Sequence, residues 1–140
     1  MTQISSSSSE DETAALGAAL ARSLPPGAVV YIEGELGAGK TAFVRGAARA
    51  LGVHEPVTSP TFTVAHLYDG DDGRIAHLDL YRNGALGNED LADLEPYFDD
   101  VRATFIEWAV RGEGVLAAPD VRVSLRVSGE GLREIEITRL

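Results

Sequence analysis

Cysteine is absent from the sequence, and this absence excludes disulfide bonds and thiolate metal sites. Long apolar runs are absent as well, since none approaches the roughly 20 residues that a membrane-spanning helix needs. The first residues lack the basic and then apolar pattern of a secretion signal. We therefore expect a cytoplasmic protein without a membrane partner.

Positive charge is scarce. Twelve basic residues face 22 acidic ones, which gives a net charge of −10. Such a chain is poorly suited to direct, salt-sensitive binding along a nucleic-acid backbone. If a nucleic acid is involved, we expect another protein to hold it.

The length of 140 residues and the 44% hydrophobic content are enough for one globular domain with a sizeable core. Residues 1–8 contain most of the run Ser5–Ser9 and little that could enter a core, so we expect a disordered tail there. The domain then spans residues 9–140. It begins with a capping box, with Ser9 at the N-cap and Glu12 at N3 of a packing helix that ends at Pro25.

Lysine occurs only once, at position 40, although the chain has eleven arginines. This lysine belongs to Gly34–Thr41, which fits the phosphate-binding pattern G-x-x-x-x-G-K-[ST]. A short apolar run, Ala28–Ile32, precedes the loop and predicts a buried parallel strand, while residues 41–51 have helical spacing. Strand, glycine-rich loop and helix are the order that a P-loop requires. The alternative is a glycine-rich turn that only caps a helix.

The residue types in this loop suit phosphate chemistry. Glycines let the backbone wrap closely around an anion, and the loop N–H groups and the helix N-terminus carry partial positive charge. The Lys40 ammonium would reach the β- and γ-phosphates, and the Thr41 hydroxyl would bind Mg²⁺. Arginine is a wide planar fork, whereas a tight anion site needs a compact ammonium.

The sequence after the loop contains a hydroxyl-rich segment and two regions that predict hairpins. Residues 57–63 carry four hydroxyl groups around Pro60, and these either contact a γ-phosphate or satisfy turns in a linker. Residues 62–68 and 74–81 predict two strands of a hairpin. Residues 121–127 and 135–137 alternate and predict an antiparallel hairpin that closes the sheet edge.

Two carboxylates, Asp79 and Glu107, stand at the ends of apolar strands. Each resembles the carboxylate that organises a metal beside a P-loop, although a solvated edge residue or a helix cap would look the same. The three histidines, at positions 54, 66 and 77, lack ligand-like spacing, so we interpret them as structural or surface residues.

Four motifs together resemble the TsaE (YjeE) family of ATPases of bacterial tRNA threonylcarbamoyladenosine biosynthesis. They are the P-loop, Ser59-Pro60-Thr61-Phe62-Thr63, His77-Leu78-Asp79-Leu80-Tyr81-Arg82 and Ile106-Glu107-Trp108. The resemblance implies an α/β fold, a P-loop NTPase-like three-layer sandwich whose central, mainly parallel sheet has antiparallel hairpin additions. It also implies ATP and Mg²⁺ as cofactors, and a TsaB–TsaD-type threonylcarbamoyl transferase complex as the partner, with tRNA contacted only indirectly.

The resemblance also assigns roles to single residues. It implies Lys40, Asp79, Thr61 and Glu107 as catalytic residues and Thr41 and Glu107 as Mg²⁺ ligands, with Trp108 following the metal glutamate. The nucleotide-binding residues are implied to be Gly37, Ala38, Gly39, Lys40, Thr41 and Ala42, with Thr13 and Arg133 near the adenine. Many relatives carry a second hydroxyl residue where this chain has Ala42, so we expect weaker nucleotide affinity here.

Other functions fit the same motifs. A small-molecule or nucleotide kinase shares the P-loop and the metal carboxylate, and a nucleotide-gated binding module would bind without hydrolysing. No arginine lies directly beside the loop in sequence, and Arg82 is the nearest candidate in a family motif. We therefore expect slow hydrolysis by the isolated chain and stimulation by the partner complex.

Overall fold

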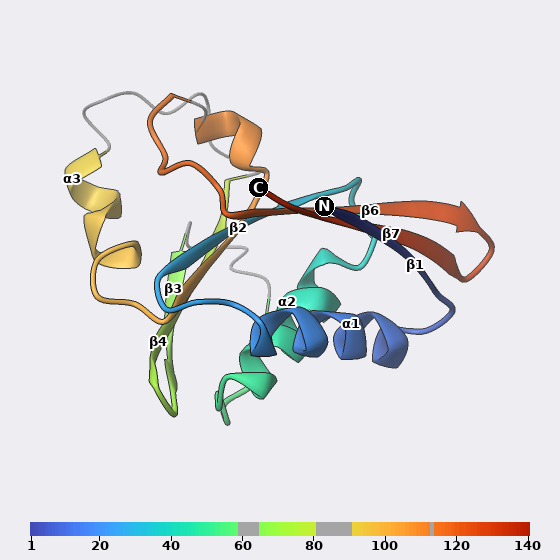
Figure 1. Ribbon diagram of the computed structural model, residues 1–140, viewed down its shortest axis with the longest axis horizontal. Helices are drawn as coiled ribbons and strands as arrows, with labels where there is room; N and C mark the ends of the chain where they lie inside the picture. The colour runs from blue at the N-terminus through green and yellow to red at the C-terminus, as the bar shows by residue number, and fades with distance from the viewer. Residues whose placement is uncertain (59–64, 81–90, 113) are drawn as a thin grey trace.

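Seven strands and two full-length helices account for most of this computed structural model, which describes residues 1–58, 65–80, 91–112 and 114–140 (Figure 1). The strands are β1 (Thr2–Ser7), β2 (Ala28–Glu33), β3 (Ala65–Gly70), β4 (Gly73–Asp79), β5 (Ala103–Glu107), β6 (Val121–Gly129) and β7 (Leu132–Arg139). The helices are α1 (Glu10–Arg22), α2 (Lys40–Ala50) and the short α3 (Leu91–Leu94), with 3₁₀ turns η2 (Glu95–Tyr97) and η3 (Ala109–Gly112).

All strands belong to one mixed sheet in the order β1-β7-β6-β2-β5-β4-β3. Its centre is parallel, because β6, β2, β5 and β4 pair in the same direction. The first five residues of β2 are buried, as expected for an apolar strand with parallel neighbours on both sides. Both predicted hairpins are confirmed as the antiparallel pairs β3–β4 and β6–β7.

The N-terminal segment differs from the prediction. We expected a disordered tail over residues 1–8, but Thr2–Ser7 forms β1 and pairs antiparallel with β7 from Thr2↔Thr138 to Ser7↔Arg133. Backbone hydrogen bonds hold this strand irrespective of its polar side chains. The C-terminal hairpin therefore does not close the sheet edge, because β1 lies outside β7.

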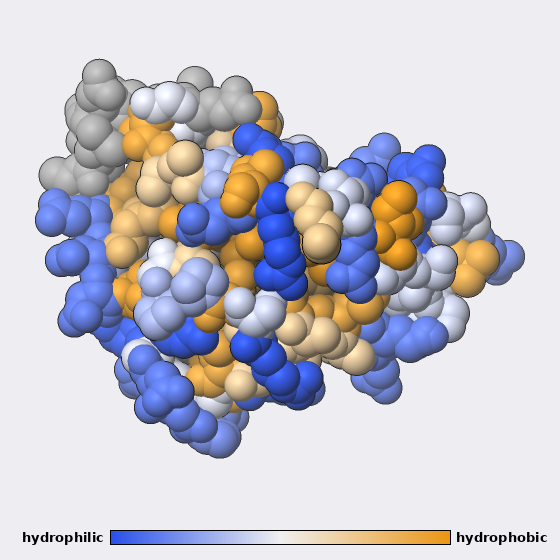
Figure 2. All heavy atoms as spheres, viewed as in Figure 1, coloured by the Kyte–Doolittle hydropathy of each residue, from blue (hydrophilic) through white to orange (hydrophobic). Residues whose placement is uncertain are grey.

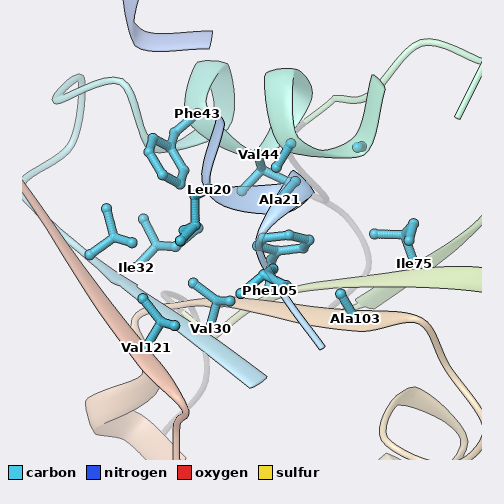
Figure 3. Close-up of a cluster of buried hydrophobic side chains, with 14 of the residues drawn as sticks. Leu20, Ala21, Val30, Ile32, Phe43, Val44, Ile75, Ala103, Phe105 and Val121 are labelled. Carbon is cyan, nitrogen blue, oxygen red and sulfur yellow. The ribbon is translucent and has the colours of Figure 1, made fainter. Parts of the chain in front are cut away.

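Helices α1 and α2 cover one face of the sheet (Figure 1). Figure 3 shows Phe43 and Val44 of α2 and Leu20 of α1 packing towards Ile32 and Phe105 of the central strands. The predicted N-cap is confirmed, since the Ser9 side chain accepts a hydrogen bond from the Glu12 N–H at 3.1 Å. The Glu12 carboxylate accepts a hydrogen bond from the backbone N–H of Ser8, one residue before the N-cap residue whose N–H donates in a standard capping box.

The other sheet face has a different cover. Its apolar side chains include Tyr31, Leu78 and Ile106, and Leu94 and Ala109 pack over them. In the described ranges this face carries only α3, η2, η3 and irregular chain (Figure 1). The expected three-layer sandwich thus has full-length helices in one of its outer layers, within the part of the chain that the structure describes.

The face of the molecule seen in Figure 2 carries both polar and apolar residues. Figure 2 shows hydrophilic residues along much of the outline of the molecule, with apolar residues visible between them. Large apolar side chains that are exposed include Ile4, Leu36 and Val110. Across the described ranges, no helix combines the length and the apolar character needed to span a membrane.

Two glycines bring α1 and α2 into backbone contact. A Cβ atom on Gly17 would lie 2.1 Å from the Phe43 carbonyl oxygen, and one on Gly46 would lie 1.9 Å from the Ala14 carbonyl oxygen. Both distances are far below van der Waals contact, and the opposing atoms are backbone atoms that cannot rotate away. The position of α2, and of the loop before it, therefore depends on these two glycines.

We predict that Gly46→Ala lowers the free energy of unfolding by about 1–3 kcal/mol, because the helices must move apart to admit a methyl group. Helix propensity alone would raise it by roughly 0.5–1 kcal/mol, so the sign of the change is informative. Urea unfolding measures both this variant and the exposed control Arg49→Ala on the same helix, for which we expect little change. A Gly46→Ala protein as stable as the wild type would contradict the backbone contact.

Candidate functional site

Residues 34–39 connect the C-terminal end of β2 to the N-terminus of α2. Gly39 is the N-cap of α2 and has φ 101°, a conformation that few other residues adopt. Gly34 lies so close to β6 that a Cβ atom there would be 2.6 Å from the Leu125 carbonyl oxygen. These positions require glycine, and they make a tight loop over the start of α2.

The Lys40 side chain folds back into this loop. Its Nζ donates hydrogen bonds to the carbonyl oxygens of Gly34 at 2.7 Å and Glu35 at 2.8 Å. The same nitrogen lies 4.9 Å from the centroid of the Trp108 ring, within range of a cation–π interaction. Only 5% of the residue is exposed. The ammonium thus has close protein neighbours on several sides, which leaves little room for a guanidinium.

Burial lowers the pKa of Lys40, because it removes water from the charged ammonium. The negative charges of Glu107 and Asp79 act in the opposite direction and favour the ammonium, but they do not outweigh burial. Lys40 on α2 thus interacts electrostatically with a carboxylate on β4 and another on β5.

Those carboxylates lie side by side. In the parallel pair β4–β5, Asp79 is in register with Glu107, and in the pair β2–β5, Ile32 is in register with Glu107. The C-terminal ends of parallel strands meet at one edge of a sheet, where α/β proteins place their ligands. Both strand-end carboxylates that the sequence singled out therefore lie at this edge, and their roles stay predictions.

A pocket of about 320 Å³ lies at this edge. Loop, helix and both carboxylates contribute to its walls, and the lining residues are Glu10, Leu36, Gly37, Gly39, Lys40, Thr41, Ala42, Arg45, Asp79, Glu107 and Trp108. Arg45 was missed by the sequence reasoning, which considered arginines directly beside the loop and Arg82 in a family motif. Five positions after Lys40, it lies on the same helix, and its Nε donates a long 3.5 Å hydrogen bond to the Val57 carbonyl.

Other predicted site residues lie elsewhere. Ala38, a residue of the loop itself, is fully buried in the hydrophobic core. The Thr13 hydroxyl forms a 2.7 Å hydrogen bond with the Ser7 hydroxyl, and Arg133 donates to the Gly37 carbonyl at 3.1 Å. Neither Thr13 nor Arg133 lines the 320 Å³ pocket, although both border the loop. Residues 59–63 of the hydroxyl-rich stretch, Thr61 among them, and likewise Arg82, lie outside the described residues, and the roles of all these residues stay predictions.

His77 is a second residue that the sequence reasoning missed. It is fully buried, and its Nε2 lies 2.5 Å from Oε2 of Glu107. Thirty residues separate the two in sequence, so no local spacing indicates the contact. Alternation in β4 is the one signal that was present: His77 is two residues before Asp79 and therefore on the same face of the strand.

The oxygen atoms of this pocket fit Mg²⁺. In the described ranges no group of three or more His, Cys, Asp or Glu side chains gathers to hold a metal unaided. Mg²⁺, however, commonly takes one or two protein oxygens and completes its shell with phosphate oxygens and water. The Thr41 hydroxyl and the Glu107 carboxylate would supply such oxygens, which suits a metal that binds together with a phosphate.

Comparisons with known proteins agree on one family. The model of the family described as "Threonylcarbamoyl adenosine biosynthesis protein TsaE" matches residues 7–135. The tRNA threonylcarbamoyladenosine biosynthesis protein TsaE of Treponema pallidum is 40% identical over 94% of this chain and 96% of its own length. The Bacillus subtilis protein of the same name is 37% identical over 91% of this chain and 80% of its own. A crystal structure of YdiB from Bacillus subtilis superposes with a TM-score of 0.82 at 32% identity, covering 99% of this chain and 86% of that one.

We predict that the pKa of Lys40, measured without nucleotide, lies below the ordinary lysine value of 10.5. The rate of modification by an amine-selective reagent, followed against pH by peptide mapping, gives this pKa, because the N-terminal amine is the only other amine present. Glu107→Gln should lower the pKa further, since it removes a charge that favours the ammonium. A wild-type pKa at or above 10.5, or a rise in the variant, would contradict the buried arrangement.

Proposed function

Since the chain belongs to the TsaE family, whose members take part in threonylcarbamoyladenosine modification of tRNA, we propose that it is a Mg²⁺-dependent ATPase. In this proposal it supports threonylcarbamoyl transfer to the adenosine beside the anticodon through a TsaB–TsaD-type complex. The observation that carries the proposal is the meeting of the Lys40 loop with Asp79 and Glu107 around one pocket.

Each of these groups has a proposed task. Lys40 would exchange its carbonyl partners for the β- and γ-phosphate oxygens and stabilise negative charge there. Thr41 and Glu107 would hold Mg²⁺, which when bound offsets phosphate charge. Asp79, the more exposed of the two carboxylates, would lie near the metal shell and orient the attacking water.

Arg45 adds a cation that the sequence reasoning did not supply. It lines the same pocket, and no ion pair holds it within the described ranges. We propose that it contacts phosphate oxygens from α2, while Thr13 and Arg133, on the border of the loop, lie near the adenine. Thr61 would sense the γ-phosphate.

Turnover by the isolated chain should be slow, because charge and metal alone do not position the water and the transition state. The net charge of −10 supports an indirect contact with tRNA, through the partner complex. A group from that complex would complete the site, as an arginine supplied in trans does in other P-loop enzymes.

ATP turnover with and without the TsaB–TsaD-type complex tests the function. We expect slow turnover by the chain alone and stimulation by the complex. Lys40→Ala should lower turnover by several orders of magnitude, because it removes the charge that stabilises the phosphate oxygens. Lys40→Arg should lower it similarly, because a guanidinium does not fit between the Gly34 and Glu35 carbonyls. Turnover that needs a small-molecule acceptor would instead indicate a kinase, and tight binding without turnover under any condition would indicate a binding module. Near-normal turnover in Lys40→Arg would contradict the proposed role of the ammonium.

Magnesium titrations separate the two carboxylates. We expect Glu107→Ala to raise the half-saturating Mg²⁺ concentration about tenfold or more, and Asp79→Ala mainly to lower the maximal rate. Glu134→Ala is a suitable control, because Glu134 lies on β7 and pairs with Arg126 at 2.8 Å outside the pocket. The reverse ranking would overturn the assignment of Glu107 as the ligand.

A further inference from the structure

His77 lies directly behind the proposed metal ligand. In the β4–β5 pair, His77 is in register with Phe105 and Asp79 is in register with Glu107, so His77 lies two register pairs further from the pocket. Because side chains alternate along a strand, His77 and Asp79 share one face of the sheet, and Phe105 and Glu107 share the same face. This face carries α2 and the phosphate loop.

The contact between the two side chains indicates which nitrogen of the imidazole ring carries the proton. Glu107 Oε2 and His77 Nε2 are 2.5 Å apart, and an ionised carboxylate can only accept hydrogen bonds. With Glu107 ionised, Nε2 carries the proton and donates the hydrogen bond to Oε2. In the neutral ring, Nδ1 then has no proton and presents a lone pair.

That second nitrogen has no hydrogen-bond partner among the residues that the structure describes. Nδ1 is buried and accepts no hydrogen bond from any residue that the structure describes. A buried polar atom without a partner is unfavourable, and an apolar side chain would avoid it. The other buried positions of β4 are indeed apolar, at Ile75, Ala76 and Leu78. What the imidazole contributes at position 77 is thus the single donor aimed at Glu107.

Glu107 needs such a donor. Only 3% of this residue is exposed, yet it lines the 320 Å³ pocket. With Oε2 engaged by His77, Oε1 is the oxygen that is left to act as a ligand. A carboxylate held at one oxygen also cannot rotate freely about its last side-chain bond.

We propose that His77 is a positioning residue for the metal site: its Nε2–H fixes the Glu107 carboxylate and reserves Oε1 for Mg²⁺. The inference rests on the proposed Mg²⁺-dependent ATP binding. In this proposal, metal affinity also depends on His77, which does not line the pocket. Mutation of groups that orient metal ligands commonly changes metal affinity about 10–100-fold.

Two variants at position 77 and one control test this role. His77→Leu keeps an apolar volume and removes the donor. His77→Gln restores an N–H donor, because its Nε2 is the same number of bonds from Cα as the imidazole Nε2. His66→Leu is the matched control: His66 is in register with His77 on β3, but it is exposed and stacks on Tyr68.

Calorimetry measures the affinity of each protein for ATP without metal and the Mg²⁺ concentration that half-saturates the tighter, metal-dependent binding. We expect His77→Leu to raise that Mg²⁺ concentration at least about tenfold while binding of metal-free ATP stays unchanged. His77→Gln should recover much of the loss, and His66→Leu should match the wild type. An unchanged Mg²⁺ requirement in His77→Leu, or equal losses in Leu and Gln, would overturn the proposal. Absence of metal-dependent ATP binding in the wild type would instead refute the proposed function.

The wild-type protein offers a test that does not depend on a folded variant. Nitrogen-15 NMR of the imidazole distinguishes its tautomers, and we expect His77 to carry its proton on Nε2 with Nδ1 unprotonated. A proton on Nδ1 with Nε2 bare would exclude donation to Glu107 and overturn the inference.

Discussion

The candidate site depends on the register of three parallel strands. β5 lies between β2 and β4, and its last residue, Glu107, is in register with both Ile32 and Asp79. Because of this alignment, the glycine-rich loop (residues 34–39) leaves β2 at the edge of the sheet where Asp79 and Glu107 lie. A shift of one residue in either pair would turn a carboxylate to the opposite face, because side chains alternate along a strand. Buried apolar side chains on both faces of these strands therefore fix the register and, with it, the positions of Asp79 and Glu107.

Much of the fold follows from short-range patterns. The apolar run before Gly34, the glycine-rich loop and the two alternating hairpins identified five of the seven strands, and β5 followed from the apolar residues before Glu107. β1 was not predictable, because Thr2–Ser7 has almost no apolar alternation. What orders this strand is pairing with β7, more than 120 residues away, together with the buried hydroxyl pair Ser7–Thr13. Backbone pairing of this kind leaves no trace in side-chain composition.

The site was predictable where a motif has a fixed spacing and not where folding alone creates the contact. Lys40, Thr41 and the two carboxylates were named from the sequence, and the structure brings them around one pocket. Arg45 was missed because about 1.4 helical turns after Lys40, not adjacency to the loop in sequence, bring it to the pocket. His77 was taken as structural or surface, since only the β4–β5 register reveals its partner. The hydroxyl-rich segment around Thr61 lies outside the described residues.

Two carbonyl groups of the loop occupy the Lys40 ammonium. The Gly34 and Glu35 carbonyl groups accept hydrogen bonds from the Lys40 ammonium, so an anion that binds this ammonium would displace two existing partners. Entry and departure then become ligand exchange at one nitrogen, in which each broken hydrogen bond is replaced by another. Such an exchange limits how tightly an anion is held, and it gives the departing anion a ready competitor. Under the proposed function, an internal competitor of this kind favours rapid exchange of the bound nucleotide over long retention.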